Sequence, residues 1–172
     1  DSVASRGLGD VYKRQTQSGY RNTTGSYNIF LGACSGYGNV TTNLTGTYNI
    51  GLGFQAAKNI CSGSDNVTIG RGAGFKIEGS SQNVFLGYYA GCSSLSNGCN
   101  IAIGTNAASL GTGLHNIAVG TLAGYNSTSG GCNVFIGHYA GCSNTTYGNT
   151  GYANVIIGAC ASRNLCGGIG NV

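Results

Sequence analysis

The chain has 172 residues, of which only 7% are charged, and its formal net charge is +4. It contains 33 glycines and no proline, methionine or tryptophan. Charge this dilute argues against an electrostatic nucleic-acid-binding surface, and the regular return of β-branched and aromatic residues argues against disorder. We therefore expect a folded chain without a nucleic-acid partner.

Residues 1–15 differ from the rest of the chain. They hold five of the twelve charged residues, namely Asp1, Arg6, Asp10, Lys13 and Arg14. They end in Val-Tyr-Lys-Arg-Gln and resemble an adapter-read-through peptide at the edge of a reading frame assembled from environmental DNA. We interpret residues 1–15 as a non-native sequencing or assembly artefact, the alternative being a natural basic tail. Residues 16–172 form a second unit, which we expect to be a solenoid truncated at both ends.

A five-residue phrase recurs from residue 28 onward: Asn, then Ile or Val, then any residue, then Ile, Leu or Val, then Gly. The copies begin at Asn28, Asn49, Asn66, Asn83, Asn100, Asn116, Asn133, Asn154 and Asn171. The steps between them are 21, 17, 17, 17, 16, 17, 21 and 17 residues. A period this short predicts a solenoid in which each repeat forms one coil. The fold class is therefore predicted as all-β, a parallel β-solenoid of ~17-residue coils.

The two faces of each predicted strand are both largely apolar. The second and fourth residues of the phrase point to one side, because side chains in a strand alternate, and we expect them to form one buried column. The residue between them is mostly apolar as well. In chain order it is Phe30, Gly51, Thr68, Phe85, Ala102, Ala118, Phe135 and Ile156. A strand that is apolar on both faces is covered on both, so we expect one face to fill the core and the other to meet identical chains around an axis.

The residues after each phrase predict corners and turns. The strand-end glycines, from Gly32 to Gly158, suit corners that need a positive φ or no Cβ. A column of small residues follows three positions later, and we expect it to let a return strand approach closely. Its members include Ala56, Ala73, Ala90, Ala107, Ala123, Ala140 and Ala161. The two 21-residue steps add residues only in the Gly/Ser/Asn/Thr-rich remainder, which we expect to form the outward loop.

The eight cysteines fall in four columns of the repeat, two in each. Members of one column are at least two coils apart, about 9.6 Å at ~4.8 Å per coil, which exceeds the ~7 Å Cα limit for a disulfide. Bridges within a coil remain open, and the best candidates are Cys92 with Cys99 and Cys160 with Cys166. An extracellular protein would favour such bridges. The alternative is that the cysteines are small buried residues or free thiols.

Three potential metal ligands, Cys99, His115 and Cys132, occupy the same column in successive coils. Their types suit zinc, but stacking separates neighbours by ~4.8 Å. The competing interpretation is a chance alignment on a variable edge. We therefore assign no metal and no cofactor, and keep these three residues as metal candidates.

The sequence offers few residues that could form a catalytic site. Beyond residue 15 the only carboxylates are Asp65 and Glu78, and their spacing brings neither to a histidine beside a nucleophile. We therefore expect no enzyme. Glycan hydrolysis needs paired carboxylates, so the enzymatic alternative is a surface-glycan-degrading fibre that shares Asp65 between subunits. The glycines at 70–74 look like a phosphate-binding loop, but every repeat has glycines there, which indicates a corner.

Aromatic residues recur at two positions of the repeat. Tyr20, Tyr37, Phe75 and Tyr125 share one position, and Tyr88, Tyr89 and Tyr139 gather with His138 at another. These rings could stack on sugars, or they could stack on one another to stabilise the coils. We keep Tyr88, Tyr89 and Tyr139 as candidates for binding a surface ligand.

Phrases such as those at residues 100–107 and 116–123 resemble the head repeats of trimeric autotransporter adhesins, the YadA-like family, and the similar glycine-rich repeats of phage tail fibres. The resemblance spans residues 16–172, although the repeat is longer here and cysteine is commoner. It implies a left-handed parallel β-roll, assembled as a homotrimer and used for attachment. It also implies an extracellular location, at a cell surface or on a virion, without membrane insertion by this segment.

The expected function is that of a structural or adhesive fibre segment, an adhesin head or tail-fibre shaft, whose variable loops meet a surface glycan or protein. A spacer without a ligand is the main alternative. A third possibility, an ice- or mineral-surface binder, requires ranks of threonine. Thr105 and Thr121 share a position, but other residue types fill it elsewhere, which disfavours that reading.

Overall fold

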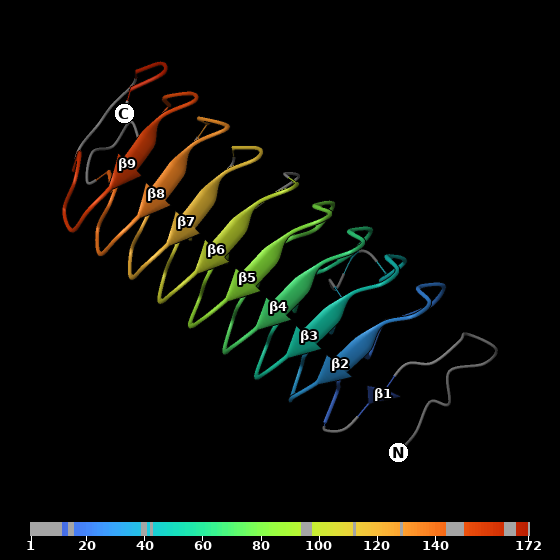
Figure 1. The fold of residues 1–172 in the computed structure, drawn as a ribbon. Helices are drawn as coiled ribbons and strands as arrows, with labels where there is room; N and C mark the ends of the chain where they lie inside the picture. Colours follow the sequence, from blue (N-terminus) through green and yellow to red (C-terminus); the bar gives the residue numbers. More distant parts are fainter. Residues whose placement is uncertain are drawn as a thin grey trace.

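A computed structural model describes residues 12–13, 16–38, 41, 43–93, 98–111, 113–127, 129–143, 150–163 and 168–171. In these residues the backbone forms short strands and turns, without a helix. Figure 1 shows the coils stacked in chain order into a rod, with the N-terminal and C-terminal coils at opposite ends. The part of the chain described here has no helix that is long and apolar enough to cross a membrane.

The strands lie in a single sheet whose order follows the sequence, and every neighbouring pair is parallel. They are β1 (Tyr12–Lys13), β2 (Ile29–Leu31), β3 (Ile50–Leu52), β4 (Val67–Ile69), β5 (Val84–Leu86), β6 (Ile101–Ile103), β7 (Ile117–Val119), β8 (Val134–Ile136) and β9 (Val155–Ile157). From β2 onward each strand consists of the three central residues of one phrase. The predicted all-β parallel solenoid is therefore confirmed.

The pairing register of the strands matches equivalent positions of the phrase, whatever the number of residues in the coil between them. Ile101 pairs with Ile117 across the 16-residue step, and Val134 pairs with Val155 across a 21-residue step. Differences in length are therefore absorbed outside the strands. The pairing also reaches into residues 1–15, where Tyr12 and Lys13 lie beside Ile29 and Phe30.

Each strand from β2 to β9 buries its middle residue and leaves the two flanking residues exposed or half-exposed. The expectation that the second and fourth phrase residues form a buried column is therefore wrong for the single chain. The physical reason is the asparagine that opens each phrase. It points to the same side as the middle residue, and in the structure it lies inside, as at Asn28 and Asn66.

The core is a narrow column enclosed by the coils. Phe30, Phe85 and Phe135 fill it from the strand side and are fully buried. The alanine column lies against them, as at Ala90 and Ala140, which are also fully buried. No coil has a second strand in the described ranges, so the expected return strand is wrong. The alanines instead face the core from a turn, and at the next position a Cβ added to Gly91 would lie 2.6 Å from the Phe85 ring.

Sharp corners close every coil. The strand-end glycines have φ between 126° and 134°, a region that is open almost only to glycine. They also lie against the next coil, because a Cβ added to Gly87 would lie 2.6 Å from the carbonyl oxygen of Gly104. The residue before each phrase asparagine is also left-handed, with φ of 57° at Tyr27 and 58° at His115. The predicted positive-φ corners are thus confirmed.

Candidate functional site

A ladder of buried asparagine side chains fixes the start of each strand and so positions the surfaces described below. The Nδ2 group of Asn66 donates to Oδ1 of Asn49 at 3.0 Å and to the carbonyl oxygen of Ser80 at 2.8 Å. Its own Oδ1 accepts from the backbone N–H and the Nδ2 group of Asn83. Buried amides need such partners. Sequence reasoning missed this role, although the recurrence of one polar residue type at an inward position indicates it.

The outer sheet face is a uniform apolar surface that runs along the rod. We define it as the second and fourth phrase residues of β2 to β9, two from each strand. All of them are Ile, Leu or Val. Several are well exposed, from 36% at Ile117 to 64% at Ile157. Contiguous apolar patches of this kind are uncommon on monomeric proteins and mark interaction sites.

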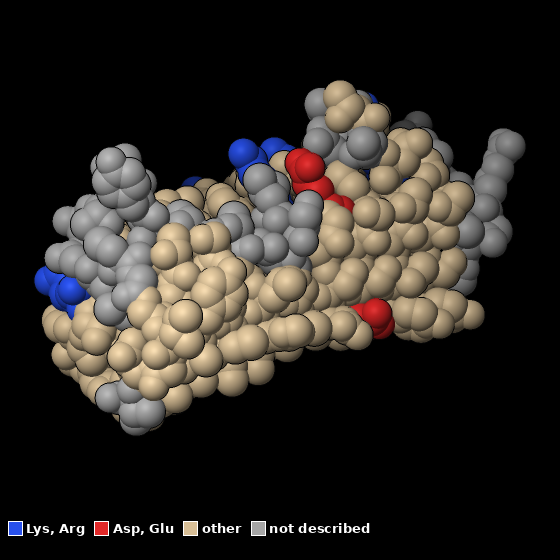
Figure 2. Space-filling view, turned by 90° about the horizontal axis from the view of Figure 1, so that it is seen from above, with Lys and Arg blue, Asp and Glu red and all other residues tan. Residues whose placement is uncertain are grey.

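Charge on the rod is sparse, as Figure 2 shows for one face, where acidic and basic side chains are scattered over a largely uncharged surface. Beyond residue 15 the chain has two acidic side chains, Asp65 and Glu78, and five basic ones. Association through the rod surface therefore relies mainly on uncharged groups, which are apolar, aromatic or polar. This feature favours contact between surfaces over electrostatic capture of a ligand.

A second surface, the aromatic edge, lies where β3, β4 and β5 end. We define it as Phe54, Arg71, Tyr88 and Tyr89. The guanidinium of Arg71 lies 5.7 Å from the ring centres of both Phe54 and Tyr88, in the coils on either side. Tyr88 meets Tyr89 edge to face, with ring centres 4.7 Å apart. The structure thus brings Tyr88 and Tyr89 together, as the sequence predicted.

One glycine makes room for this arrangement. A Cβ added to Gly72 would lie 2.7 Å from Cε1 of Tyr89, so the Tyr89 ring occupies the space above Gly72. Other coils carry a side chain at this position, such as Gln55 and Leu122. The exposed Arg71 side chain has its guanidinium near two aromatic rings, and this contact holds it at the surface.

Tyr139 belongs to a different cluster. It lies three coils from Tyr88, with its ring 4.4 Å from that of His138 and with the Arg163 guanidinium 5.0 Å from its centre. The structure therefore does not join it to the aromatic edge. Elsewhere the tyrosines stack on one another, as Tyr27 does with Tyr48 at 4.9 Å. The expected ring stacking is present at Tyr20 and Tyr37, whose ring centres lie 5.1 Å apart, whereas stacking on a sugar stays a prediction.

The metal candidates do not converge. Cys99, His115 and Cys132 each precede a ladder asparagine with a φ of 58°. The Cys99 Sγ lies 3.3 Å from Oε1 of Gln82, in the coil on the side away from His115. Across the described ranges, no three His, Cys, Asp or Glu side chains gather closely enough to hold a metal ion. The geometry therefore gives these residues no metal site.

The candidate disulfides are not formed between the described cysteines. Cys92 and Cys99 are free thiols, and they face different coils, since the Cys92 Sγ lies 3.4 Å from the carbonyl oxygen of Ser109. Cys160 is also free and exposed, and Cys166 lies outside the described residues. Burial raises the pKa of the Cys142 thiol, an effect that Arg163 opposes and Cys160 reinforces. Burial therefore favours the neutral form of the Cys142 thiol.

The carboxylates stay apart from the histidines within one chain. Asp65 is exposed and precedes the strand β4, and Glu78 lies half-buried in the next turn. His115 is three coils from Asp65 along the stack, about 14 Å at ~4.8 Å per coil. This separation is too large for a hydrogen bond. An active site shared between subunits through Asp65 stays a prediction.

Comparison with known protein families, with curated proteins and with solved structures finds no match to this chain. The functional argument therefore depends on two surfaces, the outer sheet face and the aromatic edge. Both come from side chains that repeat along the rod at the spacing of the coils.

Proposed function

We propose that this chain is a structural and adhesive fibre segment, an adhesin head or phage tail-fibre shaft, that acts as a homotrimer of left-handed β-solenoids. The observation that carries this proposal is the outer sheet face, whose aliphatic side chains are exposed or half-exposed on eight consecutive strands. An extracellular place, on a cell surface or a virion, follows from this role.

An identical chain is the occupant that fits the outer sheet face best. Two copies share one coil spacing, ~4.8 Å, so their aliphatic ranks stay in step over the whole rod. A globular partner would match only a few coils. If each of the sixteen side chains loses about 50 Å² of exposed area, the interface is on the order of 800 Å² per chain, the size of a stable one. The number three comes from the resemblance to trimeric adhesins.

The aromatic edge supplies the adhesive part of the proposal. Phe54 and Tyr88 are 45% and 44% exposed, and they flank a cationic group at the surface. Flat rings of this kind give large contact area with little loss of side-chain entropy, and a sugar ring or a protein loop can stack on them. The edge lies at the corner of the coil, beyond the strand-end glycine, so trimer formation through the strands leaves it accessible.

The solution mass of the chain tests the assembly. Light scattering with reductant should give about three times the chain mass of 17.3 kDa, because apolar contact holds the copies together. The same mass without reductant shows that disulfides do not account for it. A well-folded monomer would refute the homotrimer and leave a self-contained solenoid.

Binding to a glycan array tests the adhesive role. The chain should bind at least one surface glycan, and Tyr88→Ala should weaken that binding by about three- to tenfold through loss of ring contact. Tyr27→Ala is the matched control, because it removes an exposed tyrosine outside the aromatic edge. If the chain binds no glycan and no cell-surface protein, the spacer is the correct function. An equal loss in both variants would place the binding site elsewhere.

A further inference from the structure

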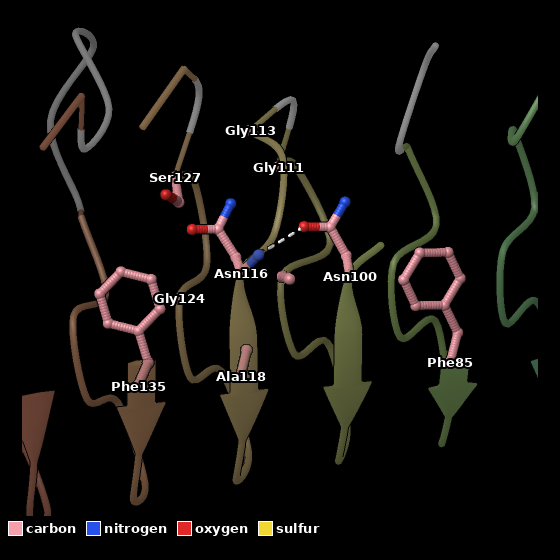
Figure 3. Close-up of a pocket in the computed structure, with 10 residues that line it drawn as sticks. Phe85, Asn100, Gly111, Gly113, Asn116, Ala118, Gly124, Ser127 and Phe135 are labelled. Carbon is pink, nitrogen blue, oxygen red and sulfur yellow. Dashed lines mark hydrogen bonds between the residues drawn. The ribbon is translucent and has the colours of Figure 1, made fainter. Parts of the chain in front are cut away.

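A small cavity lies in the core of the solenoid between the coils of β5 and β8. Phe85 and Phe135 close its two ends, and the side chains of Asn100, Asn116 and Ser127 line it on the loop side (Figure 3). The cavity has room for about one water molecule. No charged side chain lines it.

A failure of size compensation creates the cavity. Where the middle strand residue is small, the turn of the same coil supplies a buried isoleucine, as Ile60 does in the coil of Gly51 and Ile77 in the coil of Thr68. The coil of Ala118 carries Ser127 at that position of the repeat, and the coil before it carries glycine there. Two neighbouring coils therefore have small residues both at the middle of the strand and at the turn position that faces it.

The asparagine ladder is also interrupted at this place. The Nδ2 groups of Asn66 and Asn133 donate to the Oδ1 of the preceding ladder residue. Across the 16-residue step only the backbone N–H of Asn116 reaches Oδ1 of Asn100, at 2.8 Å. Among the described residues, the Asn100 Nδ2 group has no hydrogen-bond acceptor, and the Asn116 Nδ2 group has only the carbonyl oxygen of Gly130. Both amides thus retain unused N–H groups.

The third polar group that lines the cavity is the buried hydroxyl of Ser127. Ser127 is 3% exposed, and its Oγ atom has no hydrogen-bond partner in the structure. Figure 3 shows this hydroxyl on the same side of the cavity as the two amides. A buried polar atom without a partner costs about 1–3 kcal/mol. The cavity therefore combines a void of the right size with polar groups that need a ligand.

We propose that this cavity is a binding site for one internal water molecule, which bridges Ser127 Oγ to the Asn100 and Asn116 amides. The water thereby connects two asparagine side chains that make no direct hydrogen bond across the 16-residue step. Water fits because it can donate to the hydroxyl and accept from the amides, and buried waters make about three such bonds. An ion finds no countercharge there, and a larger molecule finds no room. The site is independent of whether the chain forms trimers.

The first test locates the water directly. A crystal structure of the full chain that resolves ordered solvent should show density within about 2.7–3.2 Å of Ser127 Oγ and of one amide nitrogen. In solution, magnetisation transfer should connect a slowly exchanging water with the Ala118 methyl group. Empty density in the cavity would overturn the proposal.

The second test depends on the sign of a stability change. If water is bound, Ser127→Ala removes one of its partners and should lower the melting temperature by about 2–4 °C. If the cavity is dry, the same change removes an unsatisfied hydroxyl and raises the melting temperature, which would refute the proposal. Ser62→Ala, at an exposed serine, is the matched control and should leave the melting temperature unchanged.

Discussion

At the residue scale, the inward first position of every coil depends on the dual hydrogen bonding of asparagine. Asn66 shows why, because its amide donates to one neighbouring coil and to a loop carbonyl, and accepts from the other neighbour. Aspartate lacks the donors and alanine lacks both functions. The ladder therefore explains why a polar side chain recurs within an apolar core.

Replacement of one ladder residue should be costly. Asn66→Ala removes the hydrogen bonds that the Asn66 side chain makes with the backbone N–H of Asn83 and with the carbonyl oxygen of Ser80. We expect a loss of about 3 kcal/mol in the free energy of unfolding. Urea titration of the full chain measures it. Asn59→Ala is the control, since no hydrogen bond of the half-buried Asn59 side chain is present in the described structure, and it should change the stability by less than about 0.5 kcal/mol. Equal effects would show that the ladder is not stabilising.

Strand-end glycines should tolerate no side chain. Gly87 has a φ of 134°, and a Cβ there meets the carbonyl oxygen of Gly104. Gly87→Ala should therefore destabilise the chain by at least about 2 kcal/mol. Gly79→Ala is the matched control, because its Cβ meets only the Ser62 hydroxyl at 3.7 Å, and the loss of chain entropy should make it neutral or slightly stabilising. A similar unfolding midpoint for both variants would contradict the corner argument.

At the element scale, the strand register and the asparagine ladder both tolerate the 21-residue coils, because the Nδ2 groups of Asn49 and Asn154 still donate to Oδ1 of the preceding ladder residue. The 16-residue step keeps Ile101 opposite Ile117, yet the direct bond between the Asn100 and Asn116 side chains is missing. Backbone pairing fixes only three residues per coil, while the amide geometry also depends on the turn before each asparagine. The side-chain bond is also absent between Asn83 and Asn100, where only the backbone N–H of Asn100 donates across a 17-residue step. The ladder therefore responds to the local turn, and the strand pairing does not.

Restoring the missing residue should restore the ladder. Insertion of one serine between Thr112 and Gly113 returns the step to 17 residues and should let the Asn116 Nδ2 group donate to Oδ1 of Asn100. The expected gain is about 1 kcal/mol in urea unfolding. The same insertion between Ser62 and Gly63, in a coil of regular length, should lower the stability. A gain at both places would show that loop length acts independently of the ladder.

At the scale of the whole molecule, the outer sheet face sets the proposed assembly, because the aliphatic residues of all eight coils add up to one surface. A single coil exposes too little to hold a partner, whereas the rod exposes enough for a stable interface. The aromatic edge lies at the corners and stays separate from this surface. Assembly and adhesion can therefore be altered independently.

A charge on the outer sheet face should dissociate the proposed trimer. Ile103→Lys places an ammonium group in the middle of the rod, where contact with other copies would desolvate it at a cost of several kcal/mol. Light scattering should then show monomers that retain the β-sheet circular dichroism of the parent chain. Thr105→Lys adds the same charge to the exposed corner of the same coil and should remain trimeric. Trimers in both variants would exclude the outer sheet face as the interface.

The sequence by itself determined the coil, the strands, their register and the corners, because a phrase of fixed length with a glycine at its end allows only one way of stacking. It could not decide which face of the strand points inward, since both faces are apolar and an alternating pattern is symmetric between them. Only the tertiary structure decided this, by burying the asparagine column with its hydrogen bonds satisfied. The aromatic edge was partly predictable, because Tyr88 and Tyr89 are adjacent in the sequence. The place of Phe54 and Arg71 beside them depends on which coils are stacked on one another. The same is true of the cavity at Ser127.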